Sequence, residues 1–229
     1  MPEIQLLDQA TINQIAAGEV IDRPSSVVKE LLENAIDAKA TAITVEIKDG
    51  GISFIRITDN GCGIEKDQVR KAFLRHATSK LHTIDDLLDI GSLGFRGEAL
   101  SSMELISKPP EAMLGISYQI EDGEEKSLTQ IGAPDGTTIL VRNLFYHVPA
   151  RKKFLKTAAT EGNYINQLME NMAMLRPDIS MRFINGGQNK LYTSGNGRLK
   201  DLIYTIYGRE ISSNRGDRLY WQANYFKRK

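Results

Sequence analysis

One early run of apolar residues recurs at the spacing of a single α-helical face. At about 100° per residue, the run covers one half of a helical wheel. Pro24 suits the first turn of a helix, and Ser25 or Ser26 can cap its N-terminus. The pattern therefore predicts an amphipathic helix over residues 24–37. Its apolar members are Val27, Val28, Leu31, Leu32, Ala35 and Ile36.

Three polar side chains of this predicted helix gather at the border of its apolar face. Glu30, Asn34 and Asp37 fall within about 60° of one another on the wheel. Two interpretations of this border are open. It is the solvated flank of a surface helix, which is the commoner case, or it lines a pocket between core and surface.

Two segments with alternating apolar residues follow the helix and read as a β-hairpin. A strand is predicted over residues 43–47, a turn at Asp49–Gly51, and a second strand that contains Ile55 and Ile57. Asp59 continues the parity of these two isoleucines. Its carboxylate is therefore expected to point the same way as the buried residues.

A carboxylate that points toward a core is costly unless hydrogen-bond donors reach it. Asp59-Asn60-Gly61 is good turn chemistry, which offers a purely local explanation. The alternative is a carboxylate that accepts a hydrogen bond from an N–H group of a ligand. Gly61 and Gly63 flank Cys62, so a flat ligand could approach the backbone closely there.

The rest of the chain mixes helical and strand patterns. Helices are expected at about 65–77, 161–175 and 198–207, and strands at 116–121, 137–142 and 179–183. The strands look hairpin-linked, so the fold class is α+β, or a mixed two-layer sandwich. Gly91, Gly94 and Gly97 precede Glu98, with Arg96 between them. They either offer backbone N–H groups to an anion or form a flexible surface loop.

Composition narrows the class of protein. The 229 residues contain 29 Lys and Arg and 29 Asp and Glu, so no global basic field favours nucleic acid. Cys62 is the single cysteine, which excludes an intrachain disulfide and fits a reducing compartment. We see no long apolar run, and therefore expect no membrane span, no signal peptide and a cytoplasmic location.

The order of the polar and glycine-rich motifs resembles the ATP site shared by gyrase-type topoisomerases, heat-shock chaperone ATPases, sensor histidine kinases and MutL. The motifs are Glu30-x-x-x-Asn34, Asp59-x-Gly61-x-Gly63, the glycine-rich stretch before Glu98, and Gly136-Thr137. More narrowly, the chain resembles the N-terminal ATPase region of the MutL family of DNA mismatch repair proteins. That likeness is strongest over residues 13–20, 75–80 and 94–100.

The resemblance implies a two-layer α/β sandwich, with a mixed, mostly antiparallel sheet and helices on one face. It implies that Glu30 is the general base for the attacking water and that Asn34 holds Mg²⁺ beside the phosphates of ATP. Asp59 would accept the adenine amino group, and Thr137 would support the adenine end.

The same resemblance gives roles to the glycines and to a lid. Gly61 and Gly63 would let the base lie against the chain. The lid around the triphosphate would contain Thr78, Ser79, Lys80, Gly94, Phe95, Arg96, Gly97 and Glu98.

The activity implied by the resemblance is a slow ATPase that acts as a switch. ATP would order the lid, two such domains would dimerise, and hydrolysis would reset them. The implied partners are a second copy, a mismatch-recognition protein and DNA, and the implied location is cytoplasmic, or at the nucleoid in a bacterium. A topoisomerase-type ATPase and a nucleotide-binding interaction module with negligible turnover are the alternatives.

A local basic run is the candidate DNA contact. It either meets phosphates or forms a solvated charged face, which is the commoner case. Its members are Arg151, Lys152, Lys153 and Lys156.

The expected organisation is an ATP-binding domain over residues 1–200, with its lid at about 76–102, followed by the start or remnant of a β-rich subdomain over 201–229. Family members usually carry about one or two more helical turns after Ser102. His147 stands where the family usually has asparagine.

Overall fold

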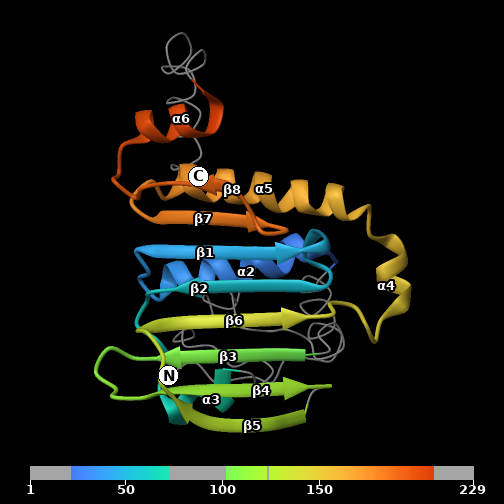
Figure 1. The fold of residues 1–229 in the computed structure, drawn as a ribbon, viewed down its shortest axis with the longest axis vertical. Helices are drawn as coiled ribbons and strands as arrows, with labels where there is room; N and C mark the ends of the chain where they lie inside the picture. The colour runs from blue at the N-terminus through green and yellow to red at the C-terminus, as the bar shows by residue number, and fades with distance from the viewer. Residues whose placement is uncertain (1–21, 73–101, 123, 209–229) are drawn as a thin grey trace, which may run out of the picture.

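A computed structural model describes residues 22–72, 102–122 and 124–208 of the chain (Figure 1). These ranges contain both strands and helices, and β3 to β6 follow one another without an intervening described helix. The strands are β1 (Ala42–Lys48), β2 (Phe54–Asp59), β3 (Ser102–Lys108), β4 (Gly115–Glu121), β5 (Glu124–Ile131), β6 (Gly136–Arg142), β7 (Ser180–Asn185) and β8 (Gln188–Tyr192). The helices are α2 (Pro24–Asp37), η1 (Asp49–Gly51), α3 (Lys66–Ala72), α4 (Pro149–Phe154), α5 (Ala158–Leu175) and α6 (Leu199–Tyr207).

The described strands form one eight-stranded sheet in the order β5-β4-β3-β6-β2-β1-β7-β8. Every neighbouring pair is antiparallel except β1 and β7, which run parallel. β1 and β2 form the predicted hairpin, with η1 as its turn. The sheet is therefore mixed and mostly antiparallel, as expected.

Buried residues on one face of the sheet form rows that cross several strands. One such row runs through Phe183, Val45, Ile57, Ile139, Leu105 and Tyr118. Helix α2 packs on this face and contacts β1, β2 and α5, and it lies behind β1 and β2 in Figure 1. The row and the helices share one hydrophobic core.

The opposite face of the sheet carries polar side chains. Thr58 and Thr138 are hydrogen-bonded across β2 and β6, and Arg56 forms an ion pair with Glu46. An antiparallel sheet with one apolar and one polar face is typical of a two-layer sandwich. The fold class predicted from the sequence is confirmed.

Helix α2 has the predicted bounds and buries the predicted face. Pro24 occupies its first turn, and Val27, Val28, Leu31, Leu32 and Ala35 are buried. The predicted serine cap is wrong. Arg23 is the N-cap residue, and its side chain makes no capping hydrogen bond, because the helix begins two residues before Ser26.

Three strands and one helix lack a clear pattern in the sequence. β5 and β8 are the edge strands of the sheet and are mostly exposed, so their residues do not alternate strongly. β3 alternates correctly, but Ser107 takes an inward position next to Met103 and Leu105. α4 is only six residues long and buries none of them. Within the described ranges, no helix is long and apolar enough to cross a membrane.

Candidate functional site

One row of the buried sheet face changes from apolar to polar at the middle of the sheet. Strand pairing places Ile43 opposite Asp59, Asp59 opposite Thr137, and Thr137 opposite Ser107. Ile43 is buried, and Ser107 and Thr137 are buried polar residues. Asp59 thus points toward the core, as its parity predicted, and it has polar neighbours there.

The Asp59 carboxylate is held by backbone donors. The N–H of Gly61 donates to Oδ1 of Asp59 at 2.7 Å, and the N–H of Thr137 also donates to this carboxylate. Burial raises the pKa of Asp59 above its ordinary value, and the two backbone hydrogen bonds oppose that rise. The local turn therefore accounts for the backbone hydrogen bonds of Asp59. The carboxylate is still half-buried, and a further hydrogen-bond donor would stabilise its charged form.

Glycines allow the backbone to close around Asp59. A β-carbon on Gly61 would lie 2.7 Å from the carbonyl oxygen of Ala38, and one on Gly63 would lie 2.7 Å from that of Lys108. Gly63 also has a φ of +69°, which favours glycine. Close contacts within the fold therefore require glycine at both positions, in addition to the expected approach of a ligand.

The Asp59 turn is joined directly to the C-terminal end of α2. The N–H of Cys62 donates to the carbonyl oxygen of Ala38 at 2.9 Å, and the N–H of Ala38 donates to that of Asn34 at 2.9 Å. Asn34 is one helical turn from Ala38, and Glu30 is one turn further. At about 1.5 Å per residue, these steps are each about 6 Å along the helix axis.

Glu30 and Asn34 lie at the border between core and surface. Both residues are half-buried, while Asp37 is exposed. Oε1 of Glu30 and Nδ2 of Asn34 have no accessible surface, and Nδ2 has no hydrogen-bond partner in the described part of the chain. Further round the helix, Lys29 and Glu33 form an exposed ion pair at 3.6 Å. The helix edge is therefore not a solvated flank at Glu30 and Asn34.

The remaining predicted lid residues lie outside the described ranges. They are Thr78, Ser79, Lys80, Gly94, Phe95, Arg96, Gly97 and Glu98. The site described by the structure therefore consists of one edge of α2 and the polar row that starts at Asp59.

Ser107 is the member of the polar row that the sequence did not single out. Its hydroxyl lies 2.9 Å from the Thr137 hydroxyl and accepts a hydrogen bond from the N–H of Ile64 at 2.9 Å. The available signal was its parity with Met103 and Leu105. Ser107 also borders a cavity of about 260 Å³, whose walls include Ile64, Pro109, Ala112, Met113 and Ile116.

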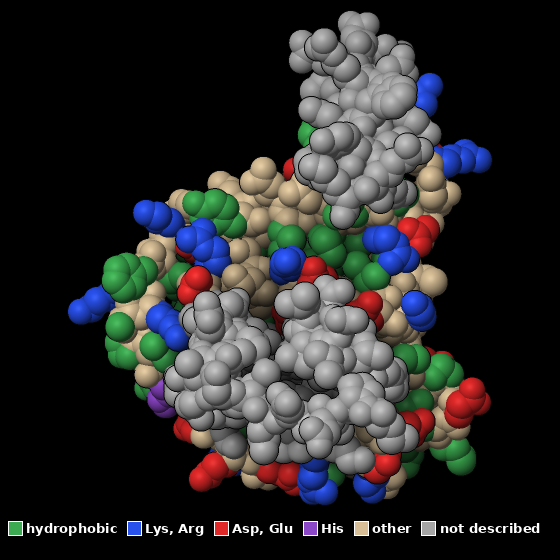
Figure 2. Space-filling model, turned by 180° about the vertical axis from the view of Figure 1, so that it is seen from behind, with side chains coloured by type: hydrophobic (Ala, Val, Ile, Leu, Met, Phe, Trp, Pro, Cys, Tyr) green, Lys and Arg blue, Asp and Glu red, His purple; other side chains and the backbone are tan. Residues whose placement is uncertain are grey.

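The basic run lies away from this row, on and beside α4. Arg151, Lys152 and Lys153 belong to the last turn of this short helix, and Lys156 follows it. Lys152, Lys153 and Lys156 are exposed. Figure 2 shows Lys and Arg side chains along the edge of the molecule that carries α4.

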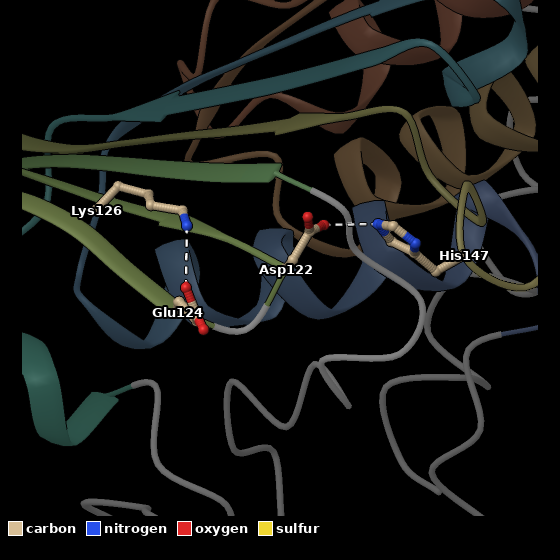
Figure 3. A network of polar contacts seen from close by, with 4 residues as sticks. All are labelled: Asp122, Glu124, Lys126 and His147. Atoms are coloured by element: carbon tan, nitrogen blue, oxygen red, sulfur yellow. Dashed lines mark hydrogen bonds and ion pairs between the residues drawn. The ribbon is translucent and has the colours of Figure 1, made fainter.

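The segment before α4 is tied to the β4–β5 turn by a surface contact. His147 Nε2 lies 2.6 Å from Oδ1 of Asp122, and Lys126 forms an ion pair with Glu124 close by (Figure 3). All four side chains are exposed, and exposed pairs of this kind contribute little to stability. The contact joins the loop before the basic run to the β4–β5 turn and does not include Asp59.

A metal held by protein ligands alone does not fit this site. The described residues contain no group of three His, Cys, Asp or Glu side chains that could bind a metal. Mg²⁺ in phosphate sites is instead held by one or two protein oxygens, the phosphates and water. The amide of Asn34, next to the acidic Glu30, fits that second arrangement.

Comparison with known proteins shows which ATPases this chain is similar to. Residues 22–112 match the model of the histidine kinase-, DNA gyrase B- and HSP90-like ATPases. The chain is 61% identical over 233 residues to the DNA mismatch repair protein MutL of Agathobacter rectalis, covering 99% of this chain and 36% of that protein. It is 49% identical to MutL of Clostridium beijerinckii, covering 93% of this chain and 33% of that protein.

Solved structures extend the similarity to the fold. The ATPase domain of Aquifex aeolicus MutL complexed with ADP superposes with a TM-score of 0.67 at 31% identity, covering 82% of this chain and 70% of that chain. A second structure of that ATPase domain gives a TM-score of 0.65, with 81% and 65% coverage.

Fold, site and comparisons together define an ATPase domain of the class found in histidine kinases, DNA gyrase B and HSP90. Within that class, the chain belongs to the MutL family of DNA mismatch repair proteins. It spans about a third of the length of the curated MutL relatives that it matches.

Proposed function

We propose that this chain binds ATP with Mg²⁺, hydrolyses it slowly, and uses the nucleotide as a switch in DNA mismatch repair. The observation that carries the proposal is the continuous arrangement of Asp59, Asn34 and Glu30. The Asp59 turn is hydrogen-bonded to the end of α2, and the other two residues follow at successive turns of that helix. The complex of Aquifex aeolicus MutL with ADP supports a nucleotide as the ligand.

Asp59 is the residue that would recognise the base. Its carboxylate can only accept hydrogen bonds when ionised, and adenine offers an exocyclic amino group that can only donate. Such a donor would offset the cost of keeping this carboxylate half-buried. Thr137, next to Asp59 across the strands, would support the same end of the nucleotide.

Asn34 would hold Mg²⁺ through its amide oxygen. The ion would supply positive charge to the phosphates, where negative charge develops during hydrolysis. Asn34 lies one turn of α2 from the Asp59 turn, so the phosphates would extend from the base along the helix.

Glu30 would act as the general base. It lies four residues before Asn34 and on the same face of α2, with Oε1 buried against the protein. A carboxylate in this position can orient a water molecule and accept its proton as the water attacks the terminal phosphate. Its role requires the acidic group itself, whereas nucleotide binding does not.

The switch and its partners complete the proposal. ATP binding would order the lid residues, from Thr78 to Lys80 and from Gly94 to Glu98, and would allow two copies to dimerise. The dimer would engage a mismatch-recognition protein in the cytoplasm, or at the nucleoid in a bacterium. The exposed lysines on and after α4 would meet DNA phosphates.

Nucleotide binding and hydrolysis by the chain, with and without Mg²⁺, test the proposal. Glu30→Ala is expected to bind ATP as the parent does and to lose turnover, because only the base is removed. Glu33→Ala changes a glutamate of the same helix that is ion-paired with the exposed Lys29, and it is the matched control, with turnover expected to equal that of the parent.

Three results would contradict parts of this proposal. Absence of ATP binding by the parent would refute the nucleotide site. Binding without measurable turnover by the parent would favour a nucleotide-dependent interaction module. Equal turnover by Glu30→Ala and the parent would remove Glu30 from the mechanism.

A further inference from the structure

The Ser107 hydroxyl is fully engaged inside the protein. The residue is 1% exposed, and its Oγ has three polar neighbours among the residues that the structure describes. The Ile64 N–H donates to it at 2.9 Å, the carbonyl oxygen of Gly136 lies at 3.1 Å, and the Thr137 hydroxyl lies at 2.9 Å. A hydroxyl has one proton and two acceptor lone pairs, so three partners use all of its capacity.

The chemistry of the three partners fixes the direction of each hydrogen bond. The Ile64 N–H can only donate, so it occupies one lone pair of Ser107. The Gly136 carbonyl can only accept, so it takes the Ser107 proton. The remaining lone pair faces Thr137, whose hydroxyl must therefore donate. If Ser107 instead donated its proton to Thr137, no proton would remain for the Gly136 carbonyl, and the group would make one hydrogen bond fewer.

Thr137 thus spends its only hydroxyl proton on Ser107. Its oxygen keeps lone pairs and has no proton left for a ligand. Asp59 lies opposite Thr137 across β2 and β6, and its ionised carboxylate is also restricted to accepting. The row therefore presents two neighbouring acceptors, one charged and one neutral.

From this arrangement we infer that Ser107 is a specificity-determining, positioning residue, which makes Thr137 an acceptor and so selects purines with an amino group at position 6 over those with an oxo group at position 6. The inference rests on the proposed nucleotide function. Adenine offers a donor at position 6 and guanine an acceptor. A water held by both Asp59 and Thr137 would use both of its protons on them and present an acceptor to the base, which gives the same preference.

Ser107→Ala tests the inference because it removes the acceptor of the Thr137 proton. That proton can then turn toward the ligand and donate to the oxo group of guanine. The dissociation constants of ATP and GTP are measured by titration calorimetry with Mg²⁺ present. The preference of the parent for ATP over GTP is expected to fall about tenfold in Ser107→Ala, the loss that follows when a single hydrogen bond is exchanged for a mismatch.

Ser107→Thr is the conservative control. It keeps the hydroxyl, and its added methyl group has the neighbouring cavity of about 260 Å³ available. Its ATP preference is expected to match that of the parent. Thermal unfolding of each variant reports folding, and a merely structural effect of Ser107→Ala would weaken both nucleotides equally.

Thr137→Val gives a second, independent test. It removes the hydroxyl that Ser107 orients, so its ATP preference is expected to fall, and adding Ser107→Ala is expected to change the preference no further. An unchanged preference in either folded single variant would overturn the inference. A parent that binds ATP and GTP equally would overturn it too, while leaving the ATPase proposal intact. A parent that binds neither nucleotide would instead refute the proposed function.

Discussion

Gly136 lies so close to Asp59 that a β-carbon at residue 136 would be 2.1 Å from the Asp59 carbonyl oxygen. Gly136 also has a φ of +106°, in the region that favours glycine. This contact allows β6 to begin directly against the Asp59 turn, and it sets the distance between Asp59 and Thr137. The sequence motif Gly136-Thr137 thus has a steric reason in addition to its expected contact with the nucleotide.

Gly136→Ala is predicted to destabilise the protein by about 3 kcal/mol, because it combines a backbone clash with an unfavourable φ. Chemical denaturation measures the loss. Gly132→Ala is the matched control, since no atom of the described residues lies within 4 Å of a β-carbon built at residue 132. Similar losses in the two variants would contradict the steric role of Gly136.

Asn34→Ala is predicted to weaken ATP binding mainly when Mg²⁺ is present, because the lost amide oxygen would hold the ion. A tenfold rise of the dissociation constant corresponds to about 1.4 kcal/mol, which is the scale expected for one such ligand. Calorimetric titration with Mg²⁺ and with a chelator separates the two conditions. Asn163→Ala, an exposed asparagine of α5, should leave both values unchanged. An unaltered magnesium dependence in Asn34→Ala would disprove the assignment.

Asp59→Asn is predicted to stabilise the free protein at neutral pH. The pKa of Asp59 is raised in the folded state, so this carboxyl is protonated more readily there than in the unfolded chain. Stability is therefore lost as the pH rises from the ordinary value of 3.8 through the raised folded-state pKa. Asn carries no charge at any pH and escapes that loss.

The stability difference between Asp59→Asn and the parent should accordingly shrink as the pH falls below 3.8. Denaturation at a series of pH values measures it. A difference that stays constant with pH would show that the carboxyl charge is not its source. The same variant should discriminate poorly between ATP and GTP, so its gain in stability comes with a loss of recognition.

Thr157→Ala is predicted to cost about 1 kcal/mol of unfolding free energy, because the Thr157 hydroxyl accepts the N–H of Thr160 at the N-terminus of α5. Ser26→Ala at the start of α2 should change stability by less than about 0.5 kcal/mol, since Ser26 is not the cap of that helix. A loss of about 1 kcal/mol in Ser26→Ala as well would restore the capping role that the structure denies to it.

The sequence was informative wherever a residue's neighbours along the chain decide its environment. The period of α2 placed Glu30 and Asn34 at the edge of the core, and the parity of β2 placed Asp59 on the buried face. Both predictions used only local geometry, in which the helix and the strand impose the direction of each side chain.

The same local reasoning failed where a distant segment decides the environment. Ser107 becomes part of the site because β3 pairs with β6, and its partners Ile64 and Thr137 are 43 and 30 residues away. The prediction of the α2 cap was wrong for a different reason. Three successive residues, Pro24, Ser25 and Ser26, each suit the start of a helix, and the sequence pattern does not choose among them.

The polar row through Asp59, Thr137 and Ser107 also has a kinetic consequence. Its three strands come from separate parts of the chain, and the Thr138 hydroxyl donates to that of Thr58, which lies 80 positions earlier in the sequence. Contacts between such distant residues form slowly, because the entropy of closing a long loop is lost before the strands make their favourable contacts. The hairpin of β1 and β2, which pairs strands that are close in the sequence, therefore cannot recognise a base by itself. A nucleotide would bind only chains in which the central strands have already paired, so it would slow unfolding without helping folding to begin.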